Sequence, residues 1–293
     1  MSALLLAVAA SLCWGVGSVA QKHAMALAFP RIALAEVLRS LPRILGTLLR
    51  SPAWVIGFAA MIAGAALFGT ALGRGDITVV QPVVCLTGVV AALVGVGFLG
   101  ERLGRLEWAG IALTLLGVAL VGLGGGGNTA ALPAPMPLAI FVLATVLGAL
   151  AVAAAGKAWL STELTLSVAA GLVYGLTNLL GKLLTQRASL HAQAAFDLLD
   201  PHILAAVARD WPLWAILGAN VVAGVFYQTA FANGRASVVA PIVTIVSNIL
   251  PILGAVLLFG ERPHILHALG LAVVLAGTAL LALEAQRGGG GSG

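Results

Sequence analysis

Long runs of apolar residues, separated by short polar segments, dominate the pattern along this chain. Nine runs are long enough to cross the roughly 30 Å hydrocarbon core of a bilayer, which takes about 20 helical residues. They cover approximately residues 2–21, 53–73, 77–99, 107–123, 137–156, 164–181, 211–233, 236–259 and 265–283. None alternates with the period of two that a barrel strand needs, so the pattern predicts an all-α integral membrane protein with about nine transmembrane helices.

Two further segments, residues 31–50 and 190–209, have the length of a helix but carry several charged residues. Each charge at the centre of a bilayer costs about 2.5–3.5 kcal/mol, so a crossing by either segment is unfavourable. We expect both to be amphipathic helices at the membrane surface or re-entrant pieces. If residues 31–50 did cross, the number of transmembrane helices would be ten.

The composition agrees with a membrane protein and excludes a soluble one. Charged residues make up 9% of the chain, whereas a soluble domain carries about 25%. The chain has 15 Lys and Arg against 10 Asp and Glu, and most of the basic residues fall in loops on one predicted side of the membrane. The positive-inside rule therefore predicts an inner-membrane protein with its N-terminus outside and its C-terminus in the cytoplasm, and the basic excess requires no nucleic-acid partner.

An internal repeat appears when the chain is compared with itself at a shift of about 160 residues. Residues that then coincide are Trp14 with Tyr174, Ser18 with Asn178, Lys22 with Lys182, and Gly-Glu-Arg at 100–102 with Gly-Glu-Arg at 260–262. The predicted units are a first membrane repeat (1–124), a linker (125–136), an extra central helix (137–156), a second repeat (157–287) and a Gly-rich segment (288–293) that looks like an added linker. Because one extra crossing precedes the second repeat, the two repeats have inverted topology, a construction common in secondary transporters.

Three repeated motifs resemble those of the drug/metabolite transporter superfamily, the EamA-type permeases. They are the aromatic-Gly helices (SLCWGVGS and GLVYGLTN), the Gly/Val/Pro stretches (GDITVVQPVV and GRASVVAPIV) and the helices that end in Gly-Glu-Arg (FLGERLGRLEWAGI and LFGERPHILHALGL). The segments GSVAQKHA and VFYQTAFANG are most similar to bacterial relatives of NIPA-type magnesium transporters. The resemblance implies a multi-pass permease, and its closest form implies Mg²⁺ transport. However, no predicted span contains an interior Asp or Glu, and Mg²⁺ usually binds at least one carboxylate.

Polar and aromatic residues inside the predicted spans are the candidates for contact with a substrate. An amide in hydrocarbon must meet another helix, water or a ligand, and in each repeat the polar residue lies four positions after the aromatic one, on the same helix face. We expect these side chains to line a cavity near the midplane, although interhelical hydrogen bonding explains each one equally well. The predicted substrate-binding residues are Trp14, Ser18, Tyr174, Asn178, Gln81, Tyr227, Gln228 and Asn248.

Lys22 and Lys182 occupy equivalent positions, about 12 Å along the helix from the mid-span aromatic residue of each repeat. Each amine is expected either to reach the membrane surface or to form one of two electrostatic gates for an anionic or zwitterionic group. Glu101 and Glu261 lie in turns between helices, where a capping role at the membrane surface is expected, with gating as the alternative. Every charge is thus expected at a span edge, in a loop or in an interfacial segment, which argues against a buried cation site and a carboxylate proton relay.

The leading hypothesis is a permease that moves a small polar or amphiphilic solute by alternating access, with facilitated diffusion or exchange as the simplest mode. The alternatives are a Mg²⁺ transporter, a flippase of a lipid-linked phosphate or sugar, and a non-transporting membrane scaffold. The sequence contains no nucleotide-binding, hydrolytic or metal-binding motif, so we expect no enzymatic activity, no cofactor and no metal site. The expected partners are membrane lipids and a small-molecule or lipid substrate.

Overall fold

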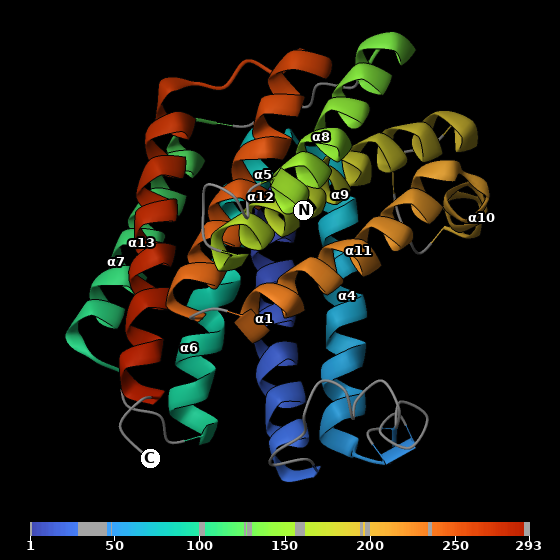
Figure 1. Cartoon of the computed structure of the whole chain (residues 1–293). Helices are drawn as coiled ribbons and strands as arrows, with labels where there is room; N and C mark the ends of the chain where they lie inside the picture. Colours follow the sequence, from blue (N-terminus) through green and yellow to red (C-terminus); the bar gives the residue numbers. More distant parts are fainter. Residues whose placement is uncertain are drawn as a thin grey trace.

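The computed structural model describes residues 2–28, 46–47, 49–99, 103–125, 127, 131–155, 162–193, 196, 200–233 and 236–289. Within these ranges the chain is helical (Figure 1). The helices are α1 (Ala3–Ala28), α4 (Pro52–Arg74), α5 (Ile77–Val84), α6 (Leu86–Leu99), α7 (Arg105–Leu123), α8 (Pro135–Ala155), α9 (Thr162–Ala192), α10 (Pro201–Arg209), α11 (Trp211–Asn233), α12 (Ala236–Leu258) and α13 (Ile265–Gly289).

Each of the nine predicted runs falls on this helical framework. Within the part of the chain that the structure describes, six helical segments are long and apolar enough to cross a membrane: Ala3–Gln21, Pro52–Arg74, Ile77–Phe98, Arg105–Leu123, Pro135–Ala154 and Leu164–Ala192. The same described residues contain three shorter apolar helices, Trp211–Tyr227, Ile242–Leu258 and Ile265–Leu281. The chain is therefore a multi-pass, all-helical membrane protein.

Two helices differ from the predicted runs. The run at 77–99 is divided at Cys85, because Pro82 has no N–H and the chain tightens there, with the Cys85 N–H donating to the Pro82 carbonyl at 3.3 Å. The run at 164–181 continues to Ala192 in α9, because Lys182, the charged residue that follows the run, is buried among polar partners. Two segments were expected at the membrane surface, and residues 31–45 of the first lie outside the described residues. The described part of the second, 190–209, includes the end of α9 and the short helix α10.

The short helix α10 begins at a strong local start signal. Pro201 occupies the first turn, where a missing N–H costs nothing, and the Asp200 carboxylate accepts a hydrogen bond from the His202 N–H at 2.8 Å. Ile203 is buried against Ala188 and Phe196, whereas the polar residues His202 and Arg209 are exposed. The helix therefore has an apolar face toward the protein and a polar face away from it.

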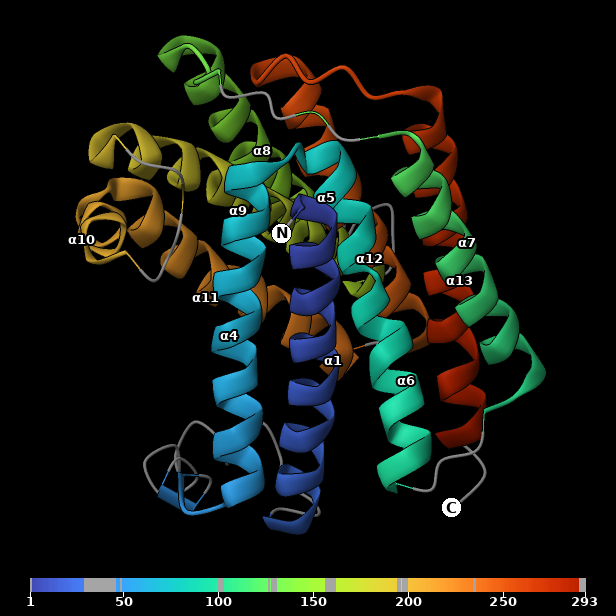
Figure 2. The same cartoon turned by 180° about the vertical axis from the view of Figure 1, so that it is seen from behind.

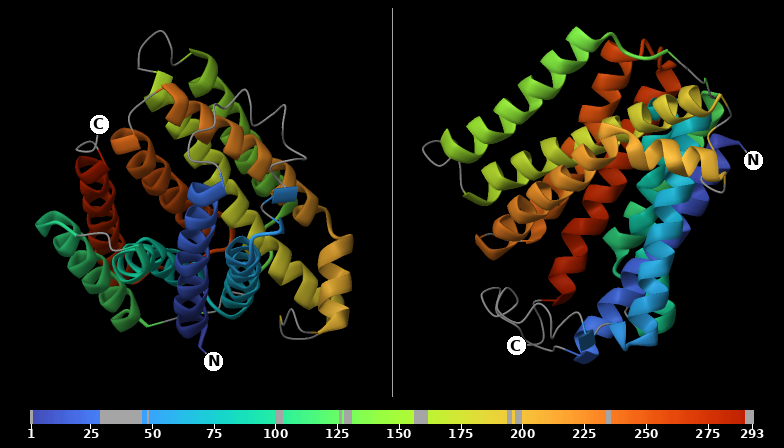
Figure 3. Two further views of the ribbon diagram at one scale, coloured as in Figure 1. Left: turned by 90° about the horizontal axis from the view of Figure 1, so that it is seen from below. Right: turned by 90° about the vertical axis from the view of Figure 1, so that its right-hand side faces the viewer.

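The helices form two groups. In the first group, α1 packs between α4 and α6 and also contacts α5 (Figure 2). In the second group, α9 packs against α8, α11 and α12. The right-hand view of Figure 3 shows that α1 and α4 lie apart from α8, α9 and α11 at one end and close to them at the other. The groups meet where α4 contacts α9 and α5 contacts α12, through a core that includes Leu72, Val80, Leu179 and Phe259.

Helix α7 packs against α13, and the two backbones approach closely at four glycines. A methyl group on Gly110 would lie 2.8 Å from the Gly277 carbonyl oxygen, and one on Gly117 would lie 2.6 Å from the Gly270 carbonyl oxygen. The reverse contacts are equally close, at 2.7 Å from Gly270 to the Gly117 oxygen and from Gly277 to the Gly110 oxygen. Only residues without a Cβ permit this packing.

Candidate functional site

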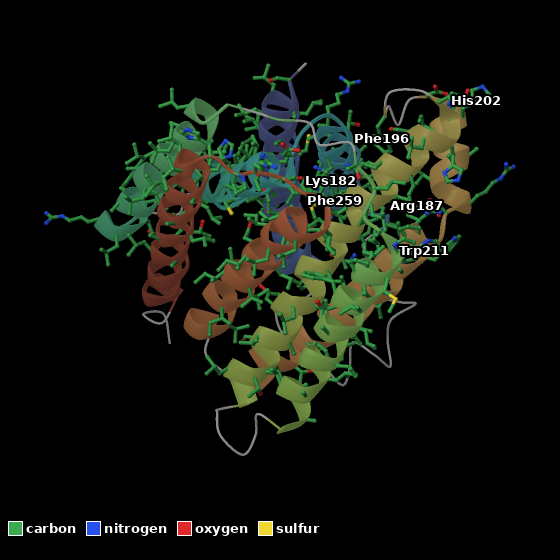
Figure 4. All side chains as sticks on the ribbon, turned by 90° about the horizontal axis from the view of Figure 1, so that it is seen from above. Lys182, Arg187, Phe196, His202, Trp211 and Phe259 are labelled. Atoms are coloured by element: carbon green, nitrogen blue, oxygen red, sulfur yellow. The ribbon has the colours of Figure 1, made fainter. Side chains whose placement is uncertain are left out.

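A buried lysine lies where the two groups meet at the start of α5. Lys182 of α9 is fully buried, and its ammonium forms an ion pair with Glu261. The same Nζ lies 3.4 Å from Asp76 Oδ1, 3.4 Å from the Gly75 carbonyl oxygen and 5.7 Å from the centre of the Phe259 ring. Figure 4 shows Lys182 and Phe259 together inside the bundle, away from the peripheral His202 and Trp211. The amine is therefore surrounded by acceptors and an aromatic face rather than by water.

Glu261 links this lysine to the beginning of a helix from the other group. Its Oε1 accepts a hydrogen bond from the Ile77 N–H at 2.9 Å, and its Oε2 accepts one from the Thr78 N–H at 3.0 Å. These two N–H groups begin α5 and have no partner within that helix, so the carboxylate satisfies them and complements the positive end of the helix dipole. One carboxylate thus holds an ammonium from α9 and the N-terminus of α5 at once.

The local sequence around Glu261 explains how the carboxylate reaches this position. Gly260 follows α12 with φ of +68°, a conformation that favours glycine, and the chain reverses there. The Glu261 N–H then donates to the Ala255 carbonyl at 3.1 Å, which fixes the residue against the end of α12. Gly-Glu in this motif is therefore a turn that aims a carboxylate back into the bundle.

Asp76 completes the cluster from the residue that precedes α5. It is 7% exposed, its backbone N–H donates to the Gly127 carbonyl at 3.1 Å, and its carbonyl accepts from Val79 and Val80 in the first turn of α5. We refer to Lys182, Asp76 and Glu261 as the ion cluster.

The ion cluster corrects two expectations from the sequence. Lys182 lies at an end of the bundle as expected, but its amine does not reach the membrane surface, because two carboxylates receive it inside the protein. The expected absence of a buried carboxylate is also wrong, since Asp76 and Glu261 are both buried. Each carboxylate stands beside an apolar run rather than within it, so the sequence pattern places them at span edges while the fold turns them inward. Lys22 has no described side chain, and Glu101 lies outside the described residues.

A second polar pair lies one turn deeper along α5. Gln81 comes four residues after Ile77, about 6 Å along the helix axis, and its Nε2 donates to Asn248 Oδ1 of α12 at 3.3 Å. The Asn248 Nδ2 donates to the Thr244 carbonyl at 2.7 Å, and its Oδ1 also accepts from the Cys85 thiol at 3.4 Å. These contacts orient both amides, so Gln81 Oε1 is left as a buried acceptor with no partner among the described residues.

The other predicted substrate-binding residues are divided between the two groups. Trp14 packs on α4: its Nε1 donates to the Met61 carbonyl at 3.1 Å, and its ring centre lies 5.3 Å from that of Phe68. Ser18 donates to the Gly15 carbonyl of its own helix at 2.9 Å. The first group therefore holds both of these side chains within its own helices.

Tyr174 has a corresponding place in the second group. Its ring meets that of Tyr227 of α11 edge-on, with 6.2 Å between the ring centres. Asn178 is half-buried, with no hydrogen bond to its amide among the described residues, and the side chain of Gln228 is not described. The structure thus brings Gln81 to Asn248 and Tyr174 to Tyr227, while Trp14 and Tyr174 contact separate helices.

The ion cluster offers no vacant ligand set for a metal ion. Asp76 and Glu261 share the ammonium of Lys182, which occupies the place where a cation would bind the carboxylates. Among the described residues, no group of three or more His, Cys, Asp and Glu side chains could hold a metal. The chemistry of this region is therefore that of an internal ion pair and a pair of amides.

Comparison with known proteins agrees with the architecture. A protein of Corynebacterium glutamicum that is described as uncharacterized is 28% identical over 289 residues, which covers 96% of this chain and 94% of that protein. No solved structure matches the chain. The sequence profile of the EamA-like transporter family matches residues 1–123, the region from α1 to α7. With its apolar helices, the chain is a multi-pass membrane protein similar to EamA-like transporters of the drug/metabolite transporter superfamily.

Proposed function

We propose that this protein is a permease that moves a small polar or amphiphilic solute across the cytoplasmic membrane by alternating access. In this proposal the helix groups are inverted repeats that rock against each other around a site between them. The N-terminus lies outside and the C-terminus in the cytoplasm, as the distribution of basic loops favours.

The reciprocal glycine contacts support the relation between the repeats. A shift of 160 residues carries Gly110 to Gly270 and Gly117 to Gly277. In the α7–α13 pair, Gly110 meets Gly277 and Gly117 meets Gly270, which is the cross-matched pattern that a two-fold axis produces. The mid-span aromatics agree, because the Trp14 ring lies against Gly64 and the Tyr174 hydroxyl is the atom nearest to a methyl group placed on Gly224.

The observation that carries the proposal is the ion cluster between the two repeats. Glu261 and Lys182 belong to the second repeat, while Asp76 and the N-terminus of α5 belong to the first, so the contact closes one end of the bundle across the repeat boundary. A buried ion pair contributes little net stability, because desolvation offsets the attraction. Such a contact can therefore separate and re-form at a low net free-energy cost, as the gate of an alternating-access protein must.

The proposed substrate site lies directly inside this gate. Gln81 and Asn248 present amides there, one of them with an unused acceptor, and a solute with N–H or O–H groups would satisfy it. Trp14, Ser18, Tyr174, Asn178, Tyr227 and Gln228 would line the path when the repeats open. Lys22, the sequence equivalent of Lys182, is the proposed gate at the opposite end.

A transport assay with a mixture of solutes tests the proposal. Purified protein in proteoliposomes would receive isotope-labelled amino acids, sugars, nucleobases and polyamines together, and mass spectrometry would identify what accumulates. We expect at least one solute to enter faster than into protein-free vesicles. Gln81→Leu should reduce that uptake at least tenfold. Asn220→Leu is the matched control, because Asn220 is an exposed amide on α11 that bonds only its own helix, donating to the Ile216 carbonyl at 2.9 Å.

Two outcomes would overturn the proposal. The first is equal entry of every labelled solute into vesicles with and without the protein. The second is uptake that Gln81→Leu and Asn220→Leu reduce by the same factor. Uptake that requires a pH gradient would instead exclude facilitated diffusion as the mode and leave the permease itself supported.

A further inference from the structure

A second polar site lies outside the interface between the two groups, where α9 ends and α10 begins. It is a cavity of about 410 Å³ lined by His191, Ala192, His202, Ala205, Ala206, Arg209 and Asp210. Figure 4 places His202 at the periphery of the bundle, remote from Lys182. The cavity is therefore separate from the ion cluster and from the amide pair.

The negative charge in the wall of this cavity is already neutralised. Asp210 Oδ2 accepts from Arg187 Nε at 2.7 Å, and Oδ1 accepts from Arg187 Nη2 at 3.0 Å and from the Trp211 N–H at 3.0 Å. The carboxylate thus binds one guanidinium in a two-point contact and caps α11. Arg209 forms no ion pair with any described residue, so its charge in the cavity wall is not balanced there.

The two histidines lie in the same wall as Arg209. His191 Nδ1 lies 2.7 Å from the Arg187 carbonyl oxygen, and since a carbonyl only accepts, this nitrogen carries the proton. His191 Nε2 then remains for a ligand, and it becomes a donor when the ring is protonated. His202 and Arg209 stand on α10, seven residues apart and so on one helix face. In this polar wall the Arg209 guanidinium supplies a positive charge and several N–H donors, which match an anion with several oxygens.

The surroundings place this wall at the level of lipid head groups. Leu204, Trp211 and Trp214 are 48%, 48% and 64% exposed, and exposed tryptophans next to an amphipathic helix mark the boundary between hydrocarbon and water. An anionic phospholipid presents its phosphate at that depth, with its acyl chains beside the exposed apolar side chains. Electrostatic attraction between the phosphate and Arg209 would add to the free energy gained when the acyl chains cover apolar side chains.

We propose that the cavity between α9 and α10 binds the phosphate group of an anionic ligand, supplied by a phospholipid such as phosphatidylglycerol. A soluble phosphate ester shares this chemistry, so the test includes both sources. The proposal does not depend on transport activity, because none of these residues belongs to the proposed gate or substrate site.

The test uses the full chain, purified and depleted of lipid in detergent. Native mass spectrometry and thermal unfolding would measure binding of dioleoyl phosphatidylglycerol, dioleoyl phosphatidylcholine, glycerol 1-phosphate and inorganic phosphate. The informative variant is His202→Gln with Arg209→Gln, and because both positions are exposed we expect the ligand-free unfolding temperature to stay the same. Arg74→Gln, at an exposed arginine that ends α4, is the matched control.

We expect phosphatidylglycerol to bind at least tenfold more tightly than phosphatidylcholine, and the double variant to lose at least tenfold in affinity while Arg74→Gln loses none. Binding of glycerol 1-phosphate or inorganic phosphate at sub-millimolar concentration, lost in the same double variant, would support the site with a soluble ligand as its source. Equal affinity for both lipids, or unchanged affinity in the double variant, would overturn the proposal.

Discussion

Glu261 forms an ion pair with Lys182 and, with the same carboxylate, holds the first two N–H groups of α5. Helices α12 and α9 of one group are thereby attached to α5 of the other through a single side chain. An ammonium, a carboxylate and a helix N-terminus stabilise one another at this junction, so removal of any one leaves the others buried without full compensation.

We therefore expect Glu261→Gln to destabilise the protein by about 3–5 kcal/mol, because it leaves the Lys182 ammonium buried with one carboxylate instead of two. Thermal unfolding in detergent would measure the loss. The matched control is Glu107→Gln, which removes a charge that accepts a hydrogen bond from the Gly104 N–H at 2.7 Å at the edge of α7. That control should lose about 1 kcal/mol or less, the typical value of a capping contact.

The double variant Lys182→Met with Glu261→Gln tests whether the two side chains stabilise the protein through their mutual contact or independently of each other. Because the partners contact each other directly, the double variant should lose less stability than the sum of the two single variants, by about 0.5–3 kcal/mol. Strictly additive losses would contradict the direct coupling of the two side chains.

A gate at this end also predicts a change in the reactivity of Cys85. This thiol is buried about two helical turns inside the ion cluster, at the end of α5, where it donates to Asn248. In a Cys13→Ala background, a membrane-impermeant maleimide should label Cys85 slowly in the otherwise unchanged protein and at least tenfold faster in Glu261→Gln. Labelling from only one side of sealed vesicles would also reveal which end of the bundle faces outward. Equal labelling rates would contradict a gate formed by Glu261.

The apolar pattern predicted the helices well and the ion cluster poorly, for a physical reason. A run of about 20 apolar residues has one stable arrangement in a bilayer, so its helix follows from the local sequence. A lysine at the end of such a run can reach water or find partners, and the partners of Lys182 lie 79 and 106 residues away in sequence. The recurrence of Lys and of Gly-Glu-Arg in both repeats was the available signal, but it does not reveal that the two features meet.

The form of the interruption in the 77–99 run, a division at Cys85, depends on more than the local sequence. Pro82 interrupts the hydrogen-bond pattern of a helix, but helices often accommodate a proline when neighbours satisfy the freed carbonyl. Whether the helix bends or divides depends on tertiary contacts such as that of Ser11, whose hydroxyl lies 3.3 Å from the Val83 carbonyl oxygen.

The glycine contacts between α7 and α13 predict a strong effect of a single methyl group. Gly117→Ala places its Cβ 2.6 Å from both the Gly270 carbonyl oxygen and the Val274 backbone nitrogen, atoms that cannot move without shifting α13. Overpacking of this kind costs about 1–3 kcal/mol. Gly148→Ala in α8 is the matched control, because a methyl group there meets nothing within 4 Å. A similar unfolding temperature for the two variants would contradict the close approach of α7 to α13.

The Gln81–Asn248 pair predicts that stability and transport respond in opposite directions to one substitution. Gln81→Leu replaces the amide with an apolar side chain of similar size. Because Gln81 Oε1 is buried without a partner among the described residues, the substitution also removes the desolvation cost of an unsatisfied group, about 1–3 kcal/mol. The substitution also deprives Asn248 Oδ1 of one donor, but the Cys85 thiol still reaches it. We therefore expect an unfolding temperature equal to or above that of the unchanged protein, together with at least a tenfold loss of solute uptake in proteoliposomes. A residue kept only for packing would show the reverse, with lower stability and unchanged uptake, and that result would remove Gln81 from the proposed substrate site.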